Sequence, residues 1–180
     1  MRNNSGFTLA ELLIASSIAV LVSISILSVF AMTNRTWREA SANVVLQSNG
    51  RLILNQIAAG SHGRFGLREA NYGTIAVEDQ GRAVRFVVDK NDDPTYSEND
   101  DVTCRYYFNN NRIWYDPDTN NDGDENPLVP NGKVENILFT MNSSCINVEL
   151  TMKDYGSTRA DAYVKLNTAI FLRKARKVLR

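Results

Sequence analysis

The sequence Gly6-Phe7-Thr8-Leu9-Ala10-Glu11 leads directly into Leu12–Met32, a run of 21 residues without a charge or a proline. A helix rises about 1.5 Å per residue, so a helix over this run is roughly 31 Å long. The hydrocarbon core of a bilayer is about 30 Å thick. The N-terminal stretch therefore predicts a membrane-spanning helix.

A carboxylate lies at the start of this apolar run. An isolated acidic side chain inside a membrane is costly and is expected to have a partner. Glu11 stands four residues after Phe7, so cleavage after Gly6 would create an amino group that supplies the positive charge. The segment differs from a secretory signal peptide, whose apolar core of about 7–15 residues precedes its cleavage site.

The block from Gly6 to Leu12 resembles the processing site of type IV pilins and of the pseudopilins of type II secretion. The resemblance implies a leader at residues 1–6, cleavage after Gly6 by a prepilin peptidase, and N-methylation of Phe7. It also implies that Glu11 directs assembly by meeting the Phe7 amine of a neighbouring subunit. The implied partners are other pilin or pseudopilin subunits, the peptidase and an inner-membrane assembly platform.

The same resemblance implies a location. Residues 7–32 would form a single membrane-spanning helix in the bacterial inner membrane or the core of a filament, with the remaining domain in the periplasm. The last predicted strand, residues 164–173, is similar to the closing strand of J-type pseudopilins and W-type minor pilins. Many major pilins carry a proline within the apolar run, and its absence here favours a minor subunit.

Apolar residues recur at three- and four-residue intervals after the apolar run. This spacing predicts that an amphipathic helix continues over residues 33–60. The expected core-facing residues are Ala42, Val45, Leu46, Ile53, Leu54 and Ile57. Glycine costs about 1 kcal/mol relative to alanine inside a helix, so Gly50 marks a point where this helix can bend.

Residues 61–180 predict a β-rich head domain. Three hairpins are expected, pairing residues 74–77 with 83–88, 102–108 with 112–115, and 134–141 with 146–152. Tyr163–Leu172 alternates as a last strand. One long helix followed by hairpins predicts an α+β fold in which an antiparallel sheet packs on the helix.

Two loops of the head are strongly acidic: residues 89–101 carry six acids and one lysine, and residues 116–126 carry five acids and no base. The second loop places the pattern of a calcium-binding loop at Asp118, Asn120, Asp122, Gly123 and Asp124. The closing glutamate of that pattern is missing, because Val129 occupies the twelfth position. Calcium is therefore a candidate cofactor, and ordinary turn formation is the alternative use of these residues.

Cys104 and Cys145 are the only cysteines, and both fall at or beside predicted strands. The location implied by the resemblance is oxidising, so we expect a disulfide between them. Two buried thiols are the alternative.

No catalytic constellation appears in the sequence. The chain has a single histidine and lacks nucleotide-binding glycine motifs, HExxH and CxxC, so an enzyme is not expected. The net charge is zero, and no basic stripe accompanies the aromatic residues, so nucleic acid is not an expected partner. The alternative function is a single-span, membrane-anchored extracytoplasmic binding module whose acidic loops hold calcium or another ligand.

Overall fold

The computed structural model describes residues 8–61, 63–70, 72–89, 101–120, 123, 125–129, 133–154 and 163–172. The chain divides into two compact units, Met1–Ala42 and Asn43–Arg180.

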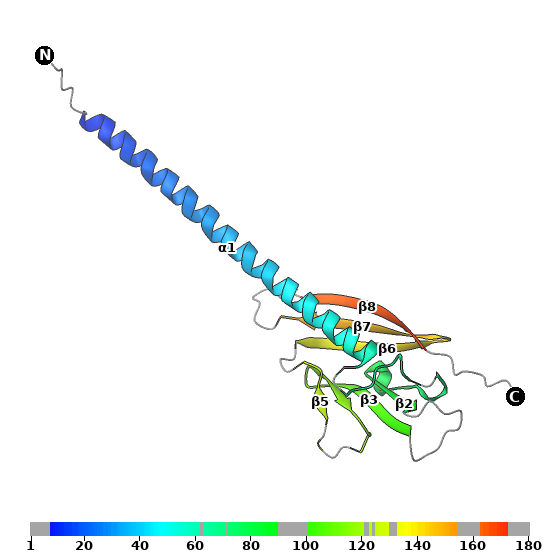
Figure 1. Ribbon diagram of the computed structural model, residues 1–180. Coiled ribbons are helices and arrows are strands. Elements are labelled where there is room, and N and C mark those ends of the chain that lie inside the picture. Colours follow the sequence, from blue (N-terminus) through cyan, green and yellow to red (C-terminus); the bar gives the residue numbers. More distant parts are fainter. Residues whose placement is uncertain are drawn as a thin grey trace. The chain divides into compact units, whose positions relative to one another are not determined.

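One helix, α1, runs unbroken over Leu9–Ala59 (Figure 1). It confirms the long helix predicted from the apolar run and the apolar spacing that follows. In its first part, the hydroxyls of Ser17, Ser23 and Ser25 each donate a hydrogen bond to the carbonyl four residues earlier, at 2.8–2.9 Å. These serines therefore satisfy their polar groups within the helix itself.

The strands of the second unit form two antiparallel sheets (Figure 1). The five-stranded sheet has the order β1 (Ala76–Glu78), β2 (Ala83–Asp89), β3 (Asp101–Asn109), β4 (Arg112–Asp116) and β5 (Asn126–Pro127). The three-stranded sheet has the order β6 (Val134–Asn142), β7 (Cys145–Lys153) and β8 (Tyr163–Phe171). Two short 3-10 helices, η1 (Tyr72–Thr74) and η2 (Asp79–Gly81), flank β1.

The predicted α+β fold, the three hairpins and the last strand are confirmed; the strands form two antiparallel sheets instead of the single sheet that was expected. The two-residue strand β5, which was not predicted, closes the first sheet. Pro127 has no N–H to donate, and the next backbone hydrogen bond to β4 comes from the Leu128 N–H to the Ile113 carbonyl at 2.9 Å. The chain then starts a second sheet at Val134, where β6 pairs with β7.

The C-terminal part of α1 supplies the helical side of the core. Its buried residues are Leu46, Gly50, Ile53, Leu54, Ile57 and Ala58. Val45 was expected to face the core but is 51% exposed. It precedes Leu46 by one residue, about 100° around the helix, and the face that packs on the sheets is the one shared by Leu46, Gly50 and Ile53.

Gly50 is a packing residue, and α1 passes through it without interruption. A Cβ atom at this position would collide with Cδ1 of Leu166 on β8 and would lie 3.4 Å from Cγ of Met152 on β7. The missing side chain therefore lets the helix approach the three-stranded sheet closely. The structure thus gives Gly50 a role in packing, and α1 is not interrupted at this residue.

The C-terminal end of α1 is closed by the segment that follows it. Gly60 has φ +70°, a left-handed conformation that favours glycine, and its N–H bonds to the Gln56 carbonyl at 2.8 Å. The N–H of Leu67 then donates to the Ile57 carbonyl at 2.8 Å, so the last carbonyls of the helix are satisfied.

Two buried tyrosines tie this segment to the five-stranded sheet. The Tyr106 hydroxyl donates to the Phe65 carbonyl at 2.7 Å, and the Tyr115 hydroxyl accepts from the Phe65 N–H at 3.2 Å. Burial is the main reason that the pKa of each tyrosine lies above its ordinary value of 10.0. Both phenols are therefore held in their neutral form.

The predicted disulfide is not formed in the structure, where Cys104 and Cys145 are both thiols. Cys104 is buried in β3, whereas Cys145 begins β7 in the other sheet. The Cys104 sulfur accepts a hydrogen bond from the Tyr115 hydroxyl at 3.2 Å and lies 3.6 Å from the Pro117 carbonyl oxygen. Its environment is thus set by neighbours within its own sheet.

The N-terminal helix as candidate functional site

The start of α1 is organised by reciprocal hydrogen bonds between Thr8 and Glu11. The Thr8 N–H donates to Oε2 of Glu11 at 2.9 Å, and the Thr8 hydroxyl donates to the same oxygen at 2.9 Å. In the other direction, the Glu11 N–H donates to the Thr8 hydroxyl oxygen at 3.3 Å. The Leu12 N–H bonds to the Thr8 carbonyl at 3.2 Å, so Thr8 is the N-cap and Glu11 the third helical residue.

This arrangement is a capping box, in which a threonine and a glutamate three residues later satisfy each other's backbone N–H groups. A carboxylate in the first turn is also favourable next to the positive end of the helix dipole. Glu11 therefore has a partner within its own chain, which the sequence reasoning missed. The sequence does contain the pattern that predicts a capping box, Thr-x-x-Glu immediately before an apolar run.

The predicted cleavage and methylation positions, Gly6 and Phe7, lie outside the described residues. The pairing of Glu11 with a Phe7 amine therefore stays a prediction. Helix α1 begins at Leu9, two residues after Phe7.

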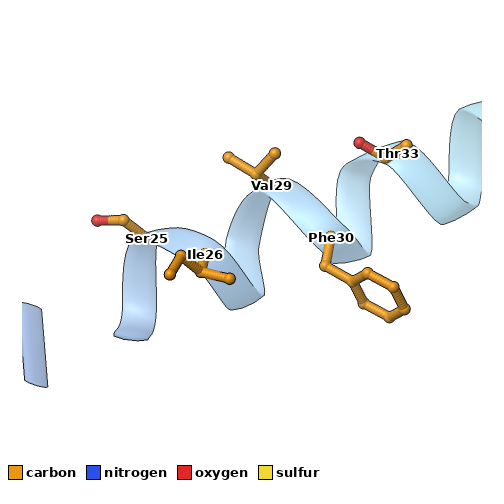
Figure 2. Close-up of a pocket in the computed structure, with 5 residues that line it drawn as sticks. All are labelled: Ser25, Ile26, Val29, Phe30 and Thr33. Atoms are coloured by element: carbon orange, nitrogen blue, oxygen red, sulfur yellow. The ribbon is translucent and has the colours of Figure 1, made fainter. Parts of the chain in front are cut away.

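The apolar part of α1 has an exposed surface of large side chains. Figure 2 shows the side chains that line a pocket on this surface, which all come from one helix: Ser25, Ile26, Val29, Phe30 and Thr33. Val29 and Phe30 point away from the helix in different directions in this view (Figure 2). The helix is long and apolar enough to cross a membrane, and none of its most apolar window is buried within the described structure. Such a surface suits insertion into lipid or packing among other apolar helices.

The candidate calcium loop is described only in part. Asp122 and Asp124 lie outside the described residues, whereas Asp118 and Asn120 lie within them. The Asn120 side-chain amide donates to Oδ2 of Asp118 at 2.6 Å, and the Asn120 N–H donates to Oδ1 of Asp118 at 3.2 Å. Asp116 is buried and accepts hydrogen bonds from the N–H groups of Asp118 and Thr119.

These contacts are typical of turns built by aspartate and asparagine. Among the described residues, no group of three or more His, Cys, Asp or Glu side chains is placed to hold a metal ion. Calcium binding by residues 118–124 stays a prediction.

The N-terminal part of the chain matches a known protein family. Residues 1–27 match a family model described as the prokaryotic N-terminal methylation motif. No curated protein matches the chain, and no solved structure does. The matched residues include the capping box and most of the apolar run, and they support a type IV pilin-like or pseudopilin-like precursor.

Proposed function

We propose that this protein is a minor structural subunit of a type IV pilus or of a type II secretion pseudopilus. One observation carries the proposal: the methylation motif of residues 1–27 leads into a helix whose apolar surface has nothing to pack against in the described residues. In a soluble domain this apolar surface would be exposed to water, whereas a filament of parallel helices buries it.

Processing is the first step of the proposed function. A prepilin peptidase removes residues 1–6 and the new amino group of Phe7 is methylated. The apolar part of α1 then holds the processed chain in the inner membrane, with the head domain on the periplasmic side. The exposed apolar surface and the internally bonded serine hydroxyls suit this stage.

Assembly is the second step. In the filament, the methylated Phe7 amine of one subunit meets Glu11 of a neighbour. A carboxylate has about four acceptor positions, so Glu11 can keep its hydrogen bonds to Thr8 and still receive an amine. Removing one partner of a buried ion pair costs about 3–5 kcal/mol, because it strands the other charge. The pair therefore selects the register of neighbouring helices more than it adds stability.

Mass spectrometry of the mature protein tests the proposal. The expected N-terminus is N-methylphenylalanine at position 7, and Gly6→Ala is expected to accumulate the full-length precursor. A mature chain that retains Met1 would instead indicate a membrane-anchored binding module, with Glu11 serving only to begin the helix.

The finer assignment to a J-type pseudopilin or a W-type minor pilin is also proposed. It is supported by the similarity of residues 164–173 to the closing strand of those subfamilies. The structure has β8 at Tyr163–Phe171, at one edge of the three-stranded sheet. Purification of assembled filaments, followed by quantification of this chain relative to the most abundant subunit, tests the minor role.

A further inference from the structure

An exposed tryptophan lies shortly after the end of the apolar run of α1. Trp37 is 73% exposed and is the fifth residue after Met32. Arg35 and Arg38 flank it on the same exposed stretch of helix. We call these three residues the boundary cluster.

Helical rise sets the depth of the boundary cluster relative to the apolar run. Five residues at about 1.5 Å each place Trp37 roughly 7.5 Å beyond Met32 along the helix. The headgroup layers bring a bilayer from about 30 Å to about 40–45 Å, which adds roughly 5–8 Å on each side. With Leu12–Met32 in the hydrocarbon core, Trp37 therefore lies at headgroup depth.

The separation between Glu11 and Trp37 is consistent with this depth. Trp37 follows Glu11 by 26 residues, and α1 is continuous between them. At about 1.5 Å per residue this separation is roughly 39 Å, close to the full thickness of a bilayer with its headgroups. With Leu12–Met32 in the hydrocarbon core, Glu11 therefore lies at one edge of that core and Trp37 lies in the headgroup layer on the other side.

The side chains of the boundary cluster suit such a layer. An indole has an apolar body and one N–H donor, and tryptophan is enriched at membrane–water interfaces for this reason. Guanidinium groups bind phosphate oxygens through paired N–H donors, while their alkyl chains lie along apolar surface. Arg35 uses its Nε–H for an ion pair with Glu39 at 3.2 Å and keeps its side chain 68% exposed.

We propose that the boundary cluster anchors α1 in the phospholipid headgroup layer, with phosphate groups as the partners of Arg35 and Arg38. This inference builds on the membrane-inserted stage of the proposed function. It needs neither cleavage nor assembly, so it can be tested on the full-length precursor.

Fluorescence quenching by brominated lipids measures the depth of Trp37. The chain has two tryptophans, so Trp114→Phe leaves Trp37 as the single reporter. The precursor is reconstituted into vesicles of phosphatidylcholine and phosphatidylglycerol, with bromine placed either near the glycerol end or near the methyl end of the acyl chains. We expect stronger quenching by the bromine near the glycerol end.

The matched control is Trp37→Phe, which keeps Trp114 on β4 as the reporter and is expected to show no quenching by either lipid. Quenching of Trp37 is expected to increase when the fraction of phosphatidylglycerol in the vesicles is raised. Arg38→Gln is expected to make this increase smaller. Absence of quenching, which a tryptophan in water or against another protein would give, overturns the proposal. So does stronger quenching by the bromine near the methyl end, because the helix would then lie at another depth.

The two proposals fail separately in these experiments. A mature chain that does not begin with N-methylated Phe7 removes the pilin function and leaves the lipid anchor standing. Unquenched Trp37 in a correctly processed chain removes the anchor and leaves the pilin function standing.

Discussion

Replacing Glu11 with glutamine separates the capping role of this side chain from its proposed role in an intersubunit ion pair. In the structure, Oε2 accepts two hydrogen bonds from Thr8, each of 2.9 Å. A glutamine amide oxygen can accept both, so the helix is expected to begin at the same residue. The negative charge is lost, so a Phe7 amine of a neighbouring subunit would be left without a counter-ion.

The expected magnitudes differ enough to be distinguished. Leaving one charge of a buried pair unpartnered costs about 3–5 kcal/mol, which lowers incorporation by roughly two to four orders of magnitude. Thr8→Val is the matched control, because it keeps the charge and removes the capping hydroxyl. Loss of an N-cap costs about 0.5–2 kcal/mol, so Thr8→Val is expected to reduce incorporation by roughly 30-fold at most.

Incorporation is measured by expressing each variant together with the wild-type chain and quantifying both in sheared filaments. Processing is followed in the same cells by mass spectrometry of the N-terminus. We expect Glu11→Gln and Glu11→Ala to be cleaved normally and to enter filaments poorly. Normal incorporation of Glu11→Gln together with poor incorporation of Glu11→Ala would show that Glu11 acts only as a cap, and the ion-pair mechanism would be refuted.

Four further predictions concern the head domain. Gly50→Leu is expected to destabilise the head domain by about 1–3 kcal/mol in denaturant unfolding, because the added side chain meets Leu166 and Met152. Ser48→Leu, at an exposed position of the same helix, is the control. Tyr106→Phe is expected to cost about 1–3 kcal/mol, because the Phe65 carbonyl loses its donor, and Tyr163→Phe on the exposed side of β8 is expected to cost far less. The pKa values of Tyr106 and Tyr115 are raised in the folded state, so the unfolded state releases these protons first as the pH passes about 10. The free energy of unfolding is therefore expected to fall as the pH rises above that value. In Tyr106→Phe this fall is expected to be less steep. If residues 118–124 bind calcium, calcium raises the unfolding midpoint more than magnesium does and Asp118→Asn removes the effect; an unchanged midpoint would contradict the calcium prediction.

The hairpins could be predicted because their turns are determined locally. Asn110 and Asn111 join β3 to β4 with φ values of 49° and 59°, the conformation that a two-residue hairpin turn requires and that asparagine tolerates. The division into two sheets could not be predicted in the same way. It depends on which strands pair after β5 ends at Pro127, and alternation along a strand does not specify a distant partner.

The two errors on the helix have one common cause. Val45 and Gly50 were interpreted from periodicity and intrinsic propensity, which describe a helix in isolation. Val45 is exposed because it lies about 100° around the helix from the buried face at Leu46, and Gly50 is buried because Leu166 and Met152 pack where a side chain would be. Tertiary contact therefore decided both positions, one exposed and one buried.

The capping box gives Glu11 a role that does not depend on filament assembly. Thr8 and Glu11 satisfy each other without any residue outside the first turn, so any anchoring helix with this sequence gains the same start. The hydrogen bonds account for the carboxylate as an acceptor, but a neutral glutamine would serve the capping box equally well. The formal charge favours the helix start through the helix dipole, but the capping hydrogen bonds do not require it. The proposed role in filament assembly therefore depends on that charge, because the neighbouring Phe7 amine would otherwise lack a counter-ion.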